Sequence, residues 1–138
     1  MRIMRTMAWV AATALLLTAA ACSSSSGGNA GRELDVSLAE YSITPAIPDI
    51  TGGTVTFQVQ NTGQQDHEMV VIRTDDAPGA LPFAEGEASE QGSQGEIPEI
   101  APGETKTLTL KLPAGHYVLI CNLPGHYMGG MHAGFVVS

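Results

Sequence analysis

The sequence predicts an all-β sandwich of about seven or eight short strands. Apolar and polar residues alternate along several segments, which is the period of a strand with one buried face. Turn signals rich in glycine, proline and asparagine separate these segments, and no segment shows a sustained helical period. Short strands with such turns are typical of a sandwich. The predicted strands cover residues 34–38, 54–61, 68–73, 104–112, 116–121 and 135–137.

Two of these segments show the alternation most clearly. In 54–61, Val55, Phe57 and Val59 alternate with threonine and glutamine, and in 104–112 three leucines alternate with threonine and lysine. One face of each strand is therefore expected to lie against the core.

Two other segments, 68–73 and 116–121, are denser apolar runs. Such runs are typical of central strands that are covered on both faces. The 28 residues from Asp75 to Pro102 fit no regular spacing and contain seven acidic residues but no lysine or arginine. We expect a solvated insertion with one helical turn there, and the alternative is a functional loop.

Composition limits the classes of protein that this chain can belong to. The 138 residues allow one domain plus a targeting segment. Fourteen acidic and six basic residues give a net charge of -8, which argues against a nucleic-acid binder. Two cysteines exclude a multi-disulfide scaffold and an all-cysteine metal or iron–sulfur site within one chain.

The N-terminal segment has the pattern of a secretory signal. Two arginines precede the apolar stretch 7–21, which is shorter than the roughly 20 residues of a membrane span. Small residues then lead to Cys22, which a run of serine and glycine follows. This pattern resembles the lipobox of a bacterial lipoprotein, although Ala19 stands where leucine is common. The alternative is a plain signal peptide with an incidental cysteine.

The lipoprotein resemblance implies a division of the chain. Residues 1–21 would be the signal peptide, 22–32 a lipidated cysteine with a flexible Ser/Gly linker, and 33–138 the folded domain. The mature chain would keep four basic and fourteen acidic residues, a net charge of -10. We therefore expect a secreted, membrane-anchored, extracytoplasmic protein at the cell surface or in the periplasm.

Chemically distinctive side chains gather near the C-terminus. Cys121, His126 and Met131 are spaced five residues apart between two predicted strands, so all three can converge from one loop. A thiolate, an imidazole and a weak thioether suit copper that cycles between two oxidation states. His67, which follows a turn and begins a predicted strand, is well placed to supply a fourth ligand.

These residues resemble the cupredoxins, the type-1 blue copper proteins. The motif N-x-G-x3-H at 61–67 is followed by C-x4-H-x4-M at 121–131, and the second spacing is most similar to that of sulfocyanin and rusticyanin. The stretch G-x-Y-x3-C at 115–121 also matches the strand that leads into the family's copper loop. The resemblance implies a Greek-key β-sandwich over 33–138 that binds one copper per chain as Cu(I) or Cu(II). Its implied equatorial ligands are His67, Cys121 and His126, and its implied weak axial ligand is Met131.

Other histidines and methionines are weaker ligand candidates. His116 is out of phase with Cys121 and is expected to point away from it, while His132 is expected to be an exposed neighbour. Met128 competes with Met131 for the role of axial ligand. It is expected instead to lie on the surface, because it follows His126 by only two residues.

One residue departs from the family pattern. Glu68 stands where several cupredoxins carry an asparagine that braces the copper loop. This departure affects the environment of the ligands and hence the reduction potential.

The resemblance implies an outer-sphere, one-electron carrier at the outer face of the membrane, not an enzyme. In the family, electrons pass through the C-terminal histidine, so an apolar surface around it would make a brief docking contact. The predicted surface comprises Leu123, Pro124, His126 and Met128. The negative charge would steer a monomeric protein toward a redox partner with a basic docking surface.

Two other functions compete with electron transfer. The alternative is a copper carrier or chaperone that delivers the metal without redox cycling. A nitrite reductase or multicopper oxidase would need further histidine-rich copper sites, and the chain has only four histidines.

Overall fold

A computed structural model describes residues 32–138 of the chain. The predicted signal peptide, the lipidation site Cys22 and nearly all of the predicted linker lie outside these residues. The described part contains eleven strands, one 3-10 turn and one short α-helix. In chain order they are β1 (Arg32–Ala39), β2 (Ser42–Pro45), β3 (Asp49–Ile50), β4 (Gly53–Asn61), β5 (His67–Arg73), η1 (Pro78–Ala80), β6 (Phe83–Ala84), β7 (Glu87–Ala88), β8 (Ser93–Ile100), β9 (Thr105–Leu112), β10 (Gly115–Ile120), α1 (His126–Gly129) and β11 (His132–Val137). Within 32–138, no helix is long and apolar enough to cross a membrane.

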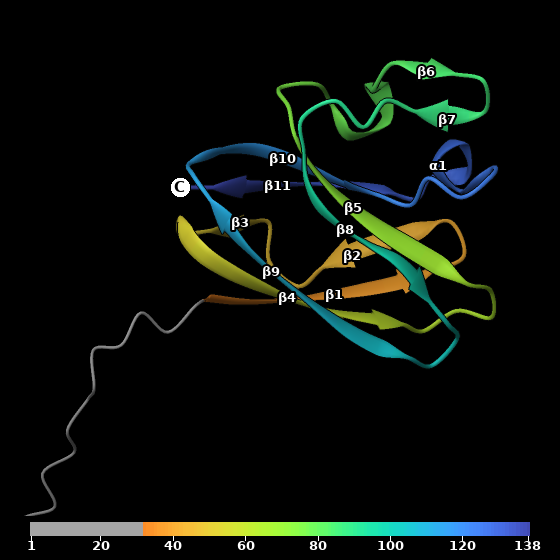
Figure 1. The fold of residues 1–138 in the computed structure, drawn as a ribbon, viewed down its shortest axis with the longest axis horizontal. Coiled ribbons are helices and arrows are strands. Elements are labelled where there is room, and N and C mark those ends of the chain that lie inside the picture. Colours follow the sequence, from red (N-terminus) through yellow and green to blue (C-terminus); the bar gives the residue numbers. More distant parts are fainter. Residues whose placement is uncertain (1–31) are drawn as a thin grey trace, which may run out of the picture.

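Two sheets pack face to face (Figure 1). The first has the order β2-β1-β4-β9 and the second has the order β3-β11-β10-β5-β8. The chain passes from β4 to β5, back to β9 and again to β10, and so crosses between the sheets repeatedly. The predicted all-β, Greek-key sandwich is confirmed. The strand count exceeds the predicted seven or eight because it includes three strands of only two residues each, β3, β6 and β7.

The core between the sheets comes from the alternating residues of the strands. In β4, Val55, Phe57 and Val59 are all fully buried, as the sequence predicts. The ring of Phe135 in β11 meets Phe57 edge-on, with centroids 5.7 Å apart, and stacks on Tyr117 of β10 at 5.3 Å. These contacts join the two sheets and give the domain a rigid interior.

β5 and β10 are buried on both faces, which explains their continuous apolar runs. Their inward residues join the main core, whereas Val70 and Ile72 of β5 and Val118 and Ile120 of β10 form a second cluster on the outer face of the sheet. Both strands lie inside the five-stranded sheet, so the prediction that they are central strands is confirmed.

Residues 75–92, called here the outer segment, cover that second face. The segment contains η1 and the hairpin β6–β7, and its Leu81 and Ala88 complete the second apolar cluster. Figure 1 shows the hairpin on the side of β10 and β11 that faces away from β1 and β4. The segment is therefore a structured cover of the sheet.

The prediction of a solvated insertion for 75–102 is wrong over β8. Residues 93–100 form an eight-residue edge strand that pairs with β5. Register shifts interrupt this pairing, and only Ile97 and Ile100 of the strand are buried. Because these two residues are three apart, the strand shows no period of two, and Pro98 is tolerated because the strand lies at a sheet edge.

Candidate metal centre

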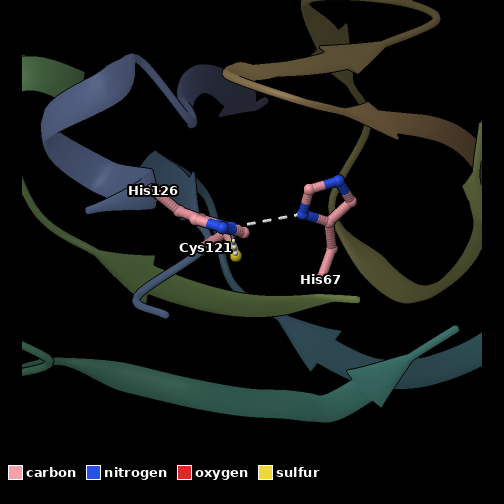
Figure 2. Close-up of side chains that lie close together, drawn as sticks. All are labelled: His67, Cys121 and His126. Atoms are coloured by element: carbon pink, nitrogen blue, oxygen red, sulfur yellow. Dashed lines mark hydrogen bonds between the residues drawn. The ribbon is translucent and has the colours of Figure 1, made fainter. Parts of the chain in front are cut away.

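All four predicted ligands lie at one end of the sandwich. His67 begins β5, Cys121 directly follows β10, His126 begins α1, and Met131 lies between α1 and β11. His67, Cys121 and Met131 are fully buried, and 9% of His126 is exposed. Figure 2 shows the imidazole of His67 facing Cys121 and His126 from the other side of the site.

The donor atoms of three of these residues converge. Nδ1 of His126 lies 3.3 Å from Nδ1 of His67 and 3.3 Å from Sγ of Cys121. One donor atom from each residue lies within 4.8 Å of the other two, and this is the one such group of three or more His, Cys, Asp or Glu residues found in 32–138. Two nitrogens that share a metal ion at about 2 Å are separated by about 3.5 Å in a trigonal arrangement. The spacing of the two imidazoles therefore fits a single metal ion.

The chemistry of the donors fits copper. A buried free thiol between two imidazoles is the set that copper electron-transfer sites use, with a thioether as the weak fourth ligand. Burial raises the pKa of the Cys121 thiol, and backbone N–H groups of Glu68 and Leu123 oppose this rise. A metal ion that binds here must therefore displace the thiol proton.

Residues 121–131, called here the ligand loop, are closed by their own backbone. The N–H of Cys121 donates to the carbonyl oxygen of Met131 at 3.1 Å, and the N–H of Met131 donates to that of His126 at 3.0 Å. Gly125 and Gly130 make the closure possible because both adopt left-handed conformations, with φ of 80° and 116°. These bonds place the Met131 backbone beside Cys121.

The turn before His67 is fixed by Asn61. Its side-chain Nδ2 donates to the carbonyl oxygens of Gln65 at 2.7 Å and Ile100 at 2.8 Å, and its Oδ1 accepts from the N–H of Gly63 at 2.9 Å. The side chain is fully buried, so these three bonds replace the water that it loses. Asn61 thus joins the end of β4, the turn and the end of β8.

Glu40, which the sequence did not single out, lies behind His67. Its Oε1 accepts hydrogen bonds from the N–H groups of Gln64 at 2.6 Å and Gln65 at 2.7 Å and lies 3.6 Å from Nε2 of His67. Nε2 is buried and has no hydrogen-bond partner within 32–138. Burial lowers the pKa of His67, the nearby His126 lowers it further, and Glu40 partly opposes both. The neutral imidazole that a metal requires is therefore favoured.

Glu68 contacts two residues of the ligand loop. Its backbone N–H donates to Sγ of Cys121 at 3.4 Å, and its Oε1 accepts from the N–H of Asn122 at 2.7 Å. The carboxylate thus braces the loop from the position where several cupredoxins carry an asparagine. Burial raises the pKa of Glu68, and the hydrogen bond from Asn122 acts in the opposite direction.

Tyr41, a second residue that the sequence did not single out, covers His126 from the turn between β1 and β2. The two rings meet edge-on with centroids 6.2 Å apart. A Cβ atom at position 129 would collide with the Tyr41 ring, so a larger residue there would have to displace the ring from His126. Tyr41 itself has a positive φ of 62°, which is uncommon for a tyrosine. Nothing in the local sequence of Glu40 and Tyr41 indicates these contacts, because they arise only when the sheets assemble.

The other predicted candidates lie away from the donors. His116 is exposed, and its Nδ1 lies 3.3 Å from Oδ1 of Asp75. His132 is half-buried, with its ring 5.3 Å from that of Tyr127, and is therefore less exposed than expected. Met128 is 67% exposed and lies on the surface.

The sandwich and its buried His–Cys–His group define a cupredoxin. The chain belongs to the copper-binding proteins of the plastocyanin/azurin family, whose model matches residues 36–138. Its cofactor is copper, with one site per chain. The comparison with curated proteins found no significant match.

Solved structures show the same fold. Auracyanin from Roseiflexus castenholzii is 23% identical, with a TM-score of 0.59 over 78% of this chain and 98% of its own. Auracyanin A from Chloroflexus aurantiacus, described as a "blue" copper protein, is 22% identical, with a TM-score of 0.54 over 77% of this chain and 99% of its own. Rusticyanin from Thiobacillus ferrooxidans is 21% identical, with a TM-score of 0.56 over 78% of this chain and 79% of its own.

Proposed function

We propose that this protein is a type-1 copper electron carrier that exchanges one electron at a time with another redox protein. The observation that carries the proposal is the buried convergence of His67, Cys121 and His126 at one end of a rigid sandwich. These residues would be the strong copper ligands, and Met131 would supply the weak thioether ligand. Copper, when bound, supplies the electron by cycling between Cu(I) and Cu(II).

The surrounding residues suit outer-sphere transfer. The core, Asn61 and Glu68 hold the donors in place, so the same geometry can serve both oxidation states. Among the four proposed ligands, His126 alone has exposed surface. It therefore offers the shortest route for an electron to leave the interior.

The proposed docking surface surrounds His126. It includes the half-buried Leu123 and the exposed Pro124 and Met128. The structure adds two exposed rings beside the ligand loop, Tyr41 against His126 and Phe83 of β6 against Tyr127. A small apolar contact of this kind suits a monomeric carrier that binds a basic partner briefly.

The first test is the visible spectrum of the copper-loaded full chain. We expect an intense thiolate-to-copper band that disappears on reduction and returns on oxidation. Cys121→Ser should abolish the band, whereas Met128→Leu should keep it because Met128 lies on the surface. If the wild-type protein binds copper without showing this band, its copper site is not of type 1 and the proposal fails.

Competition with copper chelators separates the electron carrier from the alternative of a copper carrier. An electron carrier should retain copper through repeated cycles of oxidation and reduction in the presence of a chelator. The burial of the donors favours this outcome, because an incoming ligand has little access to the metal. Loss of copper to the chelator within a few cycles would favour the alternative function, a carrier that delivers copper.

We place the protein at the outer face of the membrane, anchored through lipidated Cys22. Proteins of this family are typically extracytoplasmic. In the described residues Cys121 is a free, buried thiol, and copper ligation would protect such a thiol in an oxidising compartment. Cys22→Ala should move the protein from the membrane fraction to the soluble fraction. If the wild-type protein is itself soluble and carries no lipid by mass spectrometry, the anchor is wrong.

A further inference from the structure

The outer segment is attached to the ligand loop at Asn122. The Oδ1 of Asn122 accepts from the backbone N–H of Ala88 at 2.8 Å, and its Nδ2 donates to the carbonyl oxygen of Ala88 at 3.0 Å. The same Nδ2 lies 3.0 Å from Oε1 of Glu90. This amide therefore pairs with both backbone groups of one residue in β7, and it is almost fully buried.

A second attachment lies at Tyr127. Its hydroxyl accepts from the N–H of Leu81 at 3.0 Å and donates to the carbonyl oxygen of Pro78 at 2.9 Å. Its ring stacks on Phe83 with centroids 6.1 Å apart and an interplanar angle of 15°. The hydroxyl thus satisfies two backbone groups of the outer segment that otherwise lack a partner in the described hydrogen bonds.

The two attachments lie next to proposed copper ligands. Asn122 follows Cys121, and Tyr127 follows His126. Cys121 belongs to the main core between the sheets, whereas Tyr127 belongs to the cluster on the outer face. The ligand loop is therefore held from within by its own backbone bonds and from outside by the outer segment.

We propose that the outer segment is a brace that holds the ligand loop in its copper-binding geometry, with Asn122 and Tyr127 as the positioning residues. The inference rests on the proposed function, because an electron carrier needs ligands that do not move between oxidation states. Without the two attachments, backbone groups of Leu81 and Ala88 lose their partners, and the loop gains freedom at the residues adjoining Cys121 and His126.

The first test uses the copper-loaded full chain with Tyr127→Phe and Asn122→Ala. Tyr117→Phe is a matched control, because the Tyr117 hydroxyl donates to the carbonyl oxygen of Pro113 at 2.7 Å at the opposite end of β10. Tyr127→Phe and Asn122→Ala should shift the visible thiolate-to-copper band and the midpoint potential. Tyr117→Phe should leave both unchanged while also losing one tyrosine hydroxyl.

The second test is amide hydrogen exchange in the copper-free full chain. The N–H groups of Cys121, Gly129, Gly130 and Met131 are bonded within the ligand loop. They should exchange about fivefold faster in the two brace variants than in the wild type or the control, because at least one hydrogen bond of about 1 kcal/mol is lost. This measurement needs no copper, so it judges the brace even if the wild-type protein fails the spectroscopic test of the proposed function.

Wild-type exchange rates in both brace variants would overturn the proposal. Faster exchange with an unchanged spectrum and potential would overturn it too, since the segment would then stabilise the loop without positioning the ligands. If Asn122→Ala does not fold, Tyr127→Phe decides alone, because it keeps the ring and its stacking on Phe83.

Discussion

Glu68 adds a charge beside the sulfur of the proposed copper site. Its backbone contacts Cys121 and its carboxylate contacts Asn122, so Glu68 contacts two residues of the ligand loop at once. An anion close to a copper site stabilises the more positive Cu(II) state. Glu68 is therefore expected to lower the reduction potential as well as to brace the loop.

Glu68→Gln should raise the midpoint potential of the copper-loaded protein. Glutamine keeps an oxygen that can accept the Asn122 hydrogen bond but removes the charge, so the visible band should survive. The potential is measured at several pH values: burial raises the pKa of Glu68, so the difference between variant and wild type should grow as the pH rises and the carboxyl loses its proton. Glu33→Gln, the same change at the start of β1, is the control. Equal potentials for the Glu68 variant and the wild type would contradict the prediction.

Met131→Leu should keep the visible band and raise the midpoint potential. The thioether is the weakest proposed donor, so its loss leaves the thiolate and both imidazoles in place but makes the site more apolar, which favours Cu(I). Met128→Leu is a matched control on the surface and should leave the potential unchanged. The axial assignment is wrong if the Met128 change shifts the potential and the Met131 change does not.

At the scale of elements, the site depends on the turn between β4 and β5. This turn carries His67, and the buried Asn61 ties it to β8 through the Ile100 carbonyl oxygen. The position of one ligand is thus coupled to a strand that is distant in the sequence.

Asn61→Ala should lower the free energy of unfolding by about 3 kcal/mol, because buried backbone groups lose their partners. It should also weaken copper binding, since the turn that positions His67 becomes free to move. Urea unfolding and copper titration of the same preparation measure the two effects. The control is Thr56→Ala, which removes an exposed hydroxyl pair with Thr109 in the middle of the same sheet.

The sequence predicted the elements whose burial is regular. β4 and β9 alternate, and β5 and β10 are covered on both faces, so their patterns follow directly from their environment. β8 was missed because its pairing is bulged and its two buried residues are three apart. Its identity as a strand depends on β5, which no local pattern reveals.

The ligands of the site could be predicted from the sequence, but the residues around them could not. Three of its proposed ligands lie in one loop with a distinctive spacing, and the structure brings two of them together with His67. Glu40 and Tyr41 reach the histidines across the sandwich from a short turn, and neither carries an unusual local signal. The role of the outer segment was also hidden, because its acidic composition suggested solvent exposure and its contacts with Asn122 and Tyr127 are tertiary.

At the scale of the whole molecule, charge is unevenly distributed between the two ends. Arg73 ends β5 at the pole opposite His67, and strand pairing places Arg32 and Lys111 at that pole as well. Near the ligands lie Glu40 and Glu68. The hairpin β6–β7 adds Glu85 and Glu87 beside the ligand loop. Of the four basic residues in 32–138, Lys106 lies at the ligand end, opposite Val59 of β4. Acidic residues outnumber it there, so the local field at this end is negative.

Electron transfer with small redox reagents should reveal this field. The rate with a cationic oxidant such as tris(phenanthroline)cobalt(III) should fall as salt is added, and the rate with anionic ferricyanide should rise. Stopped-flow measurements at several ionic strengths check both trends. A cationic reagent that reacts equally fast at all salt concentrations would show that the acidic residues do not steer encounters.

The position at which the chain enters the domain determines how the copper site is oriented relative to the N-terminal tether. β1 begins at the pole far from the ligands and runs about 23 Å toward them, ending beside the turn that carries Glu40 and Tyr41 (Figure 1). A tether that joins at Arg32 would hold the domain at the end far from the ligands, so that His126 would lie at the end far from the tether. The protein would then reach for partners dissolved beyond the lipid surface rather than for proteins embedded beside it.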